Sequence, residues 1–340
     1  MRLGHGDDAA NYPGAGLVSN FSSNVYTGYR DEALLAYLRS QIEQICSYPQ
    51  PDAAQLRNVV AQREGVRPAQ VAVVAGATEA FYLIAQAFPN RRSILAAPTF
   101  SEYADAAKLH GHCVRAVAQF SKETLRQAQV AWICNPNNPT GATMRREQLV
   151  ALVEAYPECL FVLDQSYASF SLEAPLSSAE AVTLGHVLLV HSLTKEYRIP
   201  GLRLGYVTGS AELLSQLVAC QPPWTVNTLA QLAGLYLLAR PRQAFDLPAY
   251  LEESRRFQHA MAQIHGVSVT PSPVHFFLCR LRSGLSAAAL KQWLIAQHGM
   301  LIRDASNFDG LGPEAFRVCT QRPEENMRLV AAITAWMRGQ

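Results

Sequence analysis

Short apolar runs alternate with segments of helical spacing through the first two thirds of the chain. Five runs are rich in valine, isoleucine, leucine and alanine and are bounded by turn residues, at 71–75, 93–97, 130–134, 160–163 and 187–190. Runs of this length and composition predict strands that are buried on both faces. Segments with helical spacing lie between them, at 79–88, 101–110 and 146–155. This alternation predicts an α/β fold with a mostly parallel sheet.

The last third of the chain has a different pattern. A helix-like stretch covers 229–264 and is broken near Pro241 and Pro248. Four strand candidates and a closing helix follow it, at 267–270, 275–281, 300–303, 315–319 and 323–337. This order predicts a smaller α+β domain, which part of the N-terminal segment also joins. We therefore expect an N-terminal arm with part of the small domain, a large domain and a small C-terminal domain, at 1–45, 46–235 and 236–340.

The composition is typical of a compact enzyme. Of 340 residues, 49% are hydrophobic and 16% are charged, which favours a large buried core over a disordered chain. The formal net charge of +2 gives no reason to expect a nucleic-acid partner. No stretch reaches the ~18 apolar residues of a membrane span, and none resembles a signal peptide. Seven widely spaced cysteines without metal-ligand spacing predict reduced thiols, so we expect a cytoplasmic protein without a metal or a membrane partner.

Candidate chemistry lies at the predicted strand ends, where sheets of this kind bind ligands. Lys195 follows the run at 187–190, where a lysine can be desolvated and become nucleophilic toward a carbonyl. Ser192 and Arg203 offer a hydroxyl and a guanidinium group to a phosphate. A lysine beside such a pair is what pyridoxal 5'-phosphate (PLP) requires. On this segment alone, a solvated lysine beside a surface arginine explains the residues about equally well.

Three other strand ends carry polar residues. The turn at 76–78 opens a helix, and its N–H groups suit either a phosphate or an ordinary helix cap. Asn138 lies in an irregular loop and can donate to a ring oxygen of a ligand. Asp164 ends a buried strand and needs a partner, which a protonated pyridine, an arginine or a helix N-terminus can supply. No glycine-rich dinucleotide or nucleotide motif occurs at these ends.

Taken in order, these motifs resemble the class I/II aminotransferase family of fold-type I PLP enzymes, over nearly the whole chain. The resemblance rests on the sequences at 76–78, 137–141 and 192–195, together with Asp164, Tyr167 and Arg203. It implies the PLP-dependent transferase fold of type I. That fold has a large domain with a mostly parallel sheet sandwiched by helices and a smaller α+β domain.

The resemblance also implies a role for each residue. Lys195 forms the Schiff base with PLP and moves the α-carbon proton, and Asp164 pairs with the pyridine nitrogen. Tyr167 and Asn138 contact the phenolic oxygen of the ring, and Tyr103 stacks on its face. The implied phosphate site consists of the turn residues and the two groups that follow the later strand: Gly76, Ala77, Thr78, Ser192 and Arg203.

Substrate binding and assembly are implied in the same way. Arg317 resembles the arginine that grips the substrate α-carboxylate, although a solvated arginine at a strand edge is the alternative. Asn24 resembles the asparagine that also reaches this carboxylate. Tyr48 resembles the tyrosine that crosses to the cofactor phosphate of a neighbouring subunit, which implies a homodimer with shared active sites.

Two branches of the family are nearest, histidinol-phosphate aminotransferase and threonine-phosphate decarboxylase of cobalamin synthesis. The sequences His5-Gly6, 21–24, 199–206 and 223–227 are closer to the decarboxylase. Departures from it are the sequence at 25–28, the acidic pair Asp7 and Asp8, and Arg322, which stands one position from that branch's second arginine. If the two acids point inward, they would repel a phosphorylated substrate.

From these features we expect an enzyme that acts at the α-carbon of a small amino acid, with or without a phosphate group. Because several branches transaminate and the departures weigh against a phosphorylated substrate, aminotransferase activity is favoured slightly over decarboxylation of L-threonine O-3-phosphate. The two reactions share the cofactor and differ in which α-carbon bond lies perpendicular to its ring. A non-catalytic protein of the same fold is a remote alternative. An NAD-dependent dehydrogenase is a further alternative, but this chain lacks the glycine-rich motif of such enzymes.

Overall fold

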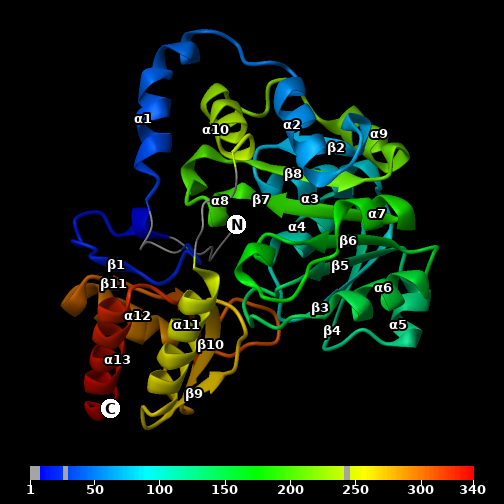
Figure 1. Ribbon diagram of the computed structural model, residues 1–340. Helices are drawn as coiled ribbons and strands as arrows, with labels where there is room; N and C mark the ends of the chain where they lie inside the picture. Colours follow the sequence, from blue (N-terminus) through cyan, green and yellow to red (C-terminus); the bar gives the residue numbers. More distant parts are fainter. Residues whose placement is uncertain (1–7, 26–29, 241–245) are drawn as a thin grey trace.

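The computed structural model describes residues 8–25, 30–240 and 246–340 (Figure 1). Seven strands form one sheet in the order β2-β8-β7-β6-β5-β3-β4. They are Val71–Val74, Arg92–Ala96, Cys113–Val117, Val130–Cys134, Leu160–Asp164, Val187–Ser192 and Gly205–Gly209, numbered β2 to β8 along the chain. Neighbouring strands from β7 to β4 pair in parallel, whereas β8 is antiparallel to both β7 and β2. The prediction of a mostly parallel sheet is confirmed.

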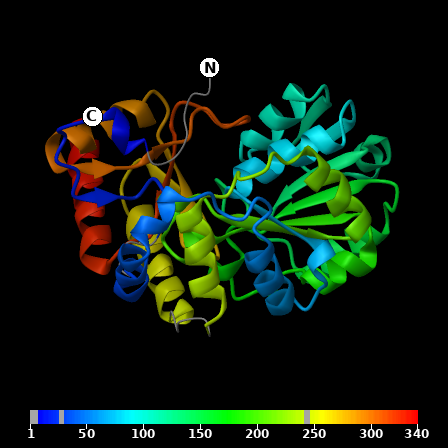
Figure 2. The same cartoon turned by 90° about the horizontal axis from the view of Figure 1, so that it is seen from above.

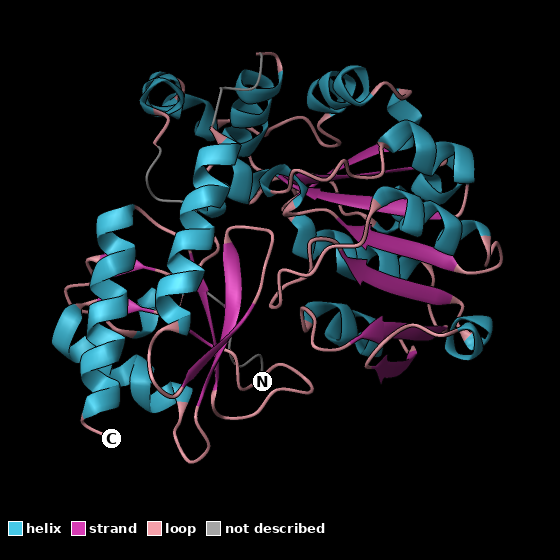
Figure 3. Ribbon diagram, turned by 60° about the horizontal axis from the view of Figure 1, so that its bottom comes forward, coloured by secondary structure: helices cyan, strands magenta, loops and turns pink. Residues whose placement is uncertain are grey.

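Helices cover both faces of this sheet (Figure 3). Successive strand residues point to opposite faces, so that Trp132 joins one core and Ile133 the other. The first core includes residues of α3 (Ala77–Ala87), α4 (Glu102–Leu109) and α9 (Ala211–Cys220). The second includes residues of α5 (Lys122–Gln127), α6 (Arg146–Glu154) and α7 (Ser178–Leu184). The sheet is therefore sandwiched between helices, as the sequence predicts.

A second sheet of four strands, in the order β12-β13-β10-β9, is built from the last third of the chain. Its strands are all antiparallel: β9 (Val267–Thr270), β10 (Phe276–Leu281), β12 (Arg303–Asp304) and β13 (Ala315–Cys319). Its core is shared with α11 (Leu247–Ala262), α12 (Ala287–His298) and α13 (Pro323–Arg338). Beside it, β1 (Ser19–Asn20) pairs in parallel with β11 (Met300–Leu301). The N-terminal segment thus lies against the C-terminal elements, as expected (Figure 2).

The remaining helices lie in the upper half of Figure 1, with α1 to the left of the large sheet. They are α1 (Glu32–Ser40), α2 (Ala54–Glu64), α8 (Leu193–Glu196) and α10 (Thr228–Leu238). The helix-like stretch predicted at 229–264 is therefore two helices, α10 and α11. Pro248 stands in the first turn of α11, where a proline is tolerated because its missing N–H has no helical acceptor. Pro241 lies outside the described residues.

Two strands of the large sheet and a detail of the small one differ from the predicted pattern. The exposed edge strand β4 was not predicted, because only part of it is apolar. The short strand β8 escapes prediction because glycine stands at both its ends. The strand predicted at 300–303 is two short strands, β11 and β12, which pair with different partners.

Within the described part of the chain, no helix is long and apolar enough to cross a membrane. The predicted domain boundaries stay a prediction.

Candidate active site

A cavity of about 290 Å³ opens where β5, β6 and β7 end. Most of the predicted site residues line it, although they come from segments far apart in the sequence: Ala77, Thr78, Tyr103, Asn138, Asp164, Tyr167, Ser192, Lys195, Arg203 and Arg317. Parallel strands place their carboxyl ends at one edge of the sheet, and this brings the loops after β5, β6 and β7 together. Arg317 reaches the same cavity from the small sheet.

Lys195 stands in the short helix α8, directly after β7. Its side chain is half-buried in the cavity wall, and Nζ donates a hydrogen bond of 3.1 Å to the carbonyl oxygen of Ser23. The amine is therefore held between the large sheet and the N-terminal segment. It is not the solvated loop lysine that the sequence left open as an alternative.

Asp164 is the last residue of β6 and is only 4% exposed. One carboxylate oxygen accepts from the backbone N–H and the hydroxyl of Ser166, at 2.9 and 2.5 Å. The other accepts from the Tyr103 hydroxyl at 2.5 Å. Burial raises the pKa of Asp164 overall, although these hydrogen bonds act in the opposite direction. A cation brought to this carboxylate would therefore find a fixed, poorly solvated partner.

Tyr103 forms the wall beside Asp164. Its ring stacks on Trp132, with centroids 6.0 Å apart and planes at 16°, and meets Phe81 edge-on at 4.7 Å. Burial, followed by the nearby Asp164 carboxylate, raises the pKa of the Tyr103 hydroxyl, which therefore stays a donor. The predicted stacking of Tyr103 on a cofactor ring stays a prediction.

Gly76 and Arg203 form a cradle at the start of α3. Gly76 has a φ of +88°, and a Cβ atom there would lie 2.6 Å from Nη2 of Arg203. Only glycine allows the guanidinium group to rest against this turn. Ala77 and Thr78 form the first turn of the helix, whose N-terminus carries a positive partial charge. Gly76 itself is not among the residues that line the cavity, so its place is behind Arg203.

Ser192 completes this side of the cavity. Its hydroxyl lies 2.7 Å from the hydroxyl of Thr194, which also lines the cavity. Four of the five predicted phosphate ligands thus line the cavity, with Thr194 as an additional hydroxyl that the sequence analysis missed.

Arg317 is 3% exposed, which excludes the alternative of a solvated arginine at a strand edge. Its guanidinium group donates to the side-chain oxygen of Asn138 and to the carbonyl oxygen of Ser22. Its Nε has no hydrogen-bond partner among the described residues. Burial lowers the pKa of this guanidinium group. A buried, incompletely paired arginine beside a cavity is suited to bind a carboxylate.

Asn24 and Tyr48 do not line the cavity. The side chain of Asn24 lies behind Tyr167 and donates to its hydroxyl at 3.2 Å, while burial raises the pKa of that hydroxyl. Tyr48 is 86% exposed, and its ring centroid lies 5.3 Å from that of Trp224. A reach of Tyr48 into a neighbouring subunit stays a prediction.

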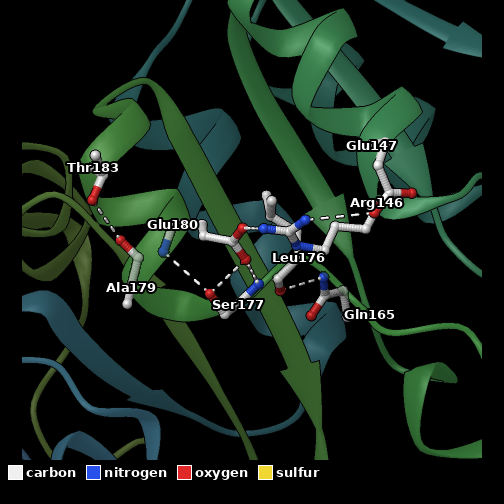
Figure 4. A network of polar contacts seen from close by, with 8 residues as sticks. All are labelled: Arg146, Glu147, Gln165, Leu176, Ser177, Ala179, Glu180 and Thr183. Atoms are coloured by element: carbon white, nitrogen blue, oxygen red, sulfur yellow. Dashed lines mark hydrogen bonds and ion pairs between the residues drawn. The ribbon is translucent and has the colours of Figure 1, made fainter.

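Other residues of the cavity escaped the sequence analysis, namely Ser23, Phe81, Phe100, Cys134, Ser166 and Thr194. Only Ser166 had a local signal, because a serine two residues after an aspartate commonly bonds back to it. Beside it, Gln165 donates to the carbonyl oxygen of Leu176 and so fastens the loop after β6 (Figure 4). An ion pair between Arg146 and Glu180 joins α6 to α7 in the same region (Figure 4).

A second buried arginine, Arg303, also escaped the sequence analysis. It pairs with Arg317 in the register of β12 and β13, which places both side chains on one face of the small sheet. Arg303 is 5% exposed, and its Nη2 donates to Asn307 at 2.6 Å. Burial, and then the neighbouring Arg317, lower the pKa of Arg303 to about 10. Two such cations on one face are suited to a ligand with two anionic groups.

The structure describes some of the residues at which the sequence departs from the decarboxylase branch. Asp8 accepts from the ammonium group of the buried Lys291, so its charge is compensated. Asp7 and His5-Gly6 lie outside the described residues, as do 26–28. Arg322 is exposed at the start of α13, whereas the preceding Gln321 is buried and donates to the carbonyl oxygens of Asn20 and Val25.

The chain is similar in sequence or in structure to several other proteins. A histidinol-phosphate aminotransferase of Symbiobacterium thermophilum is 31% identical, over 88% of this chain and 85% of its own length. An adenosylcobalamin biosynthesis bifunctional protein of Leptospira interrogans is 25% identical over 93% of this chain, which spans 38% of that longer protein. The crystal structure of L-threonine-O-3-phosphate decarboxylase from Porphyromonas gingivalis has a TM-score of 0.90 at 36% identity, covering 94% of this chain and 100% of that one.

A family model for class I and II aminotransferases matches residues 18–333, which is nearly the whole chain. The fold of the large sheet, the lysine after β7 and the named relatives agree with this match. The chain therefore belongs to the class I and II aminotransferase family.

Proposed function

We propose that this protein binds PLP through Lys195 and decarboxylates L-threonine O-3-phosphate. The observation that carries the proposal is the pairing of Arg317, which lines the cavity, with Arg303 on the same face of the small sheet. A substrate with both a carboxylate and a phosphate fits two guanidinium groups. The enzymes of this family depend on PLP, and the similarity to the decarboxylase of Porphyromonas gingivalis supports the choice of substrate.

The residues of the cavity fit PLP. Gly76 leaves room for Arg203, which, with the N-terminus of α3, offers donors to a phosphate. Asp164 has a pKa raised by burial, and a protonated ring nitrogen would offset that cost. Lys195 places its amine in the same cavity. These three features support the cofactor independently of one another.

PLP supplies an electron sink for the charge left on the α-carbon when one of its bonds breaks. Asp164 would keep the ring nitrogen protonated, and Tyr103 would form the adjoining wall. Asn138 and Tyr167 would contact the phenolic oxygen and orient the ring. Lys195 would hold the cofactor through Nζ until the substrate amine takes its place. The released amine would then deliver a proton to the α-carbon after CO₂ has left.

The substrate would be held at two points. Arg317 would bind the α-carboxylate with its planar fork, and Asn24 would support this contact through Tyr167. Arg303 would bind the phosphate, and the pairing with Lys291 compensates Asp8, one of the two acids that act on Arg303. Anchoring both anions would fix the rotation about the bond between the amino nitrogen and the α-carbon. This rotation decides which bond of the α-carbon lies perpendicular to the ring and breaks.

Transamination of histidinol phosphate is the second candidate. The 31% identity to the Symbiobacterium thermophilum aminotransferase favours it. Histidinol phosphate carries a phosphate but no carboxylate, so it would leave one of the two arginines without an anionic partner. For this reason we place decarboxylation first.

We also propose a homodimer. Ile42, Ile45 and Tyr48 are exposed apolar residues within one short segment, and Trp224 beside Tyr48 is exposed as well. A second copy that covered this surface would bring Tyr48 toward its neighbour. Sedimentation should then give twice the chain mass of 37.3 kDa, and a monomer would contradict the proposal. The cytoplasmic location stays a prediction.

The proposed reaction is tested by a product assay on protein loaded with PLP. L-threonine O-3-phosphate is supplied with and without a 2-oxo acid, and CO₂ and new amino acid are measured. We expect CO₂ without any acceptor. An absence of CO₂, together with amino transfer from histidinol phosphate to the 2-oxo acid, would establish the second candidate instead.

A further inference from the structure

His275 precedes β10 and is completely buried. Its ring lies against that of Phe170, with centroids 3.8 Å apart, and Nε2 lies 3.1 Å from the carbonyl oxygen of Asn24. A carbonyl oxygen only accepts, so Nε2 carries the hydrogen and donates it. Among the described residues, Nδ1 has no hydrogen-bond partner.

Three consecutive carbonyl oxygens of the N-terminal segment 22–24 accept hydrogen bonds from three different elements. Arg317 donates to Ser22, Lys195 to Ser23, and His275 to Asn24. The segment needs these bonds, because Asn24 is held at a φ of +52°, in the left-handed region. Gln321 holds its flanks through the carbonyl oxygens of Asn20 and Val25.

In the proposed function, two of these three donors have another task. Lys195 would hold the cofactor, and Arg317 would bind the substrate carboxylate. With cofactor and substrate bound, Lys195 and Arg317 would each have fewer N–H groups left to donate to the segment. The segment must still hold Asn24 against Tyr167 in that state. His275 is not among the residues that line the cavity, so its donor would remain available.

We propose that His275 is a positioning residue that keeps segment 22–24 in place when Lys195 and Arg317 turn to cofactor and substrate. The inference rests on the proposed function. An imidazole suits this task because it donates without adding a charge. Burial, and to a lesser extent the cations Arg317 and Lys195, lower the pKa of His275 to about 3, so a third positive charge does not compete for the carboxylate.

The test uses two variants of His275. His275→Phe keeps a ring against Phe170 but removes the donor, whereas His275→Gln keeps an N–H at a similar reach. Hydrogen exchange of the peptide covering 19–25 is followed in unliganded protein, each variant alone and combined with Lys195→Met, which withdraws one donor without any cofactor. Thermal unfolding of the same samples reports global stability.

We expect His275→Phe alone to change exchange of this peptide only slightly, because Lys195 and Arg317 still hold it. Combined with Lys195→Met, it should make this peptide exchange at least about tenfold faster than the product of the two single-variant rate factors, near the upper worth of a neutral hydrogen bond. His275→Gln should restore slow exchange. Simple additivity, or equal effects of Phe and Gln, would overturn the inference.

Kinetics supply the second readout. In PLP-loaded protein, His275→Phe should raise KM for L-threonine O-3-phosphate about tenfold with a smaller change in kcat, and His275→Gln should stay within about threefold of the unmodified protein. An unchanged KM with a lowered unfolding temperature would indicate a purely structural role. If the unmodified protein itself releases no CO₂, the proposed function fails, whereas the exchange cycle still decides the role of His275.

Discussion

At the scale of residues, the site depends on side chains whose properties are set by their immediate surroundings. Asp164 has a pKa raised by burial, yet three donors from Ser166 and Tyr103 fix its orientation. A carboxylate in this setting is stabilised by a cation in the cavity more strongly than an exposed one would be. The same reasoning applies to Arg203, which lies against a turn that only glycine permits.

The turn at Gly76 gives a direct prediction. Gly76→Ala should lower the affinity for PLP about tenfold or more, because the new Cβ pushes Arg203 out of the cradle and a charge-assisted hydrogen bond is lost. The backbone strain should cost about 1–3 kcal/mol. Both are measured by titration of the apoprotein with PLP and by thermal unfolding.

Gly65→Ala is the matched control. Gly65 also has a positive φ, of +67°, but nothing lies within 4 Å of the position of its Cβ. It should therefore lose about 1–2 kcal/mol of stability without losing PLP affinity. An equal loss of affinity in both variants would show that strain, and not the displacement of Arg203, is responsible.

At the scale of elements, the pairing of β12 with β13 carries the proposed choice of substrate. The register sets Arg303 opposite Arg317, although the loop at 305–314 separates the two strands along the sequence. Like charges opposite each other on a sheet destabilise it, unless an anion compensates them. Both arginines are buried and Arg317 lines the cavity, so an anionic ligand bound there would offset this repulsion.

Arg303→Met should raise KM for L-threonine O-3-phosphate at least about tenfold, since a hydrogen bond between charged groups is lost. The binding of L-threonine, which lacks the phosphate, should change little. Arg280→Met is the control, because Arg280 stands on β10 of the same sheet and pairs with Glu314 at the surface. If threonine and its phosphate lose affinity equally, Arg303 does not contact the phosphate.

The sequence predicts the large sheet well, because its central strands are continuous apolar runs and its site residues follow them directly. Asp164 at the end of β6 and Lys195 after β7 are found for this reason. Arg303 and His275 are not found, because neither belongs to a local motif. They are connected to the site only through the register of the small sheet and the position of segment 22–24, which no short stretch of sequence reveals.

At the scale of the whole molecule, the candidate site is assembled from three parts of the chain. The large sheet supplies Lys195 and Asp164, the small sheet supplies Arg317, and the N-terminal segment crosses between them. A change in the position of any one part would therefore alter the hydrogen bonds that it forms with the other two. This arrangement explains why the hydrogen bonds to segment 22–24 come from both sheets.

The central claim is that PLP is held in this cavity by Lys195. The most direct measurement is borohydride reduction of the PLP-loaded protein, followed by digestion and mass analysis of the peptides. We expect the pyridoxyl label on the peptide that contains Lys195, and no label in the Lys195→Ala variant. A label on a different lysine, or none on the unmodified protein, would contradict the account.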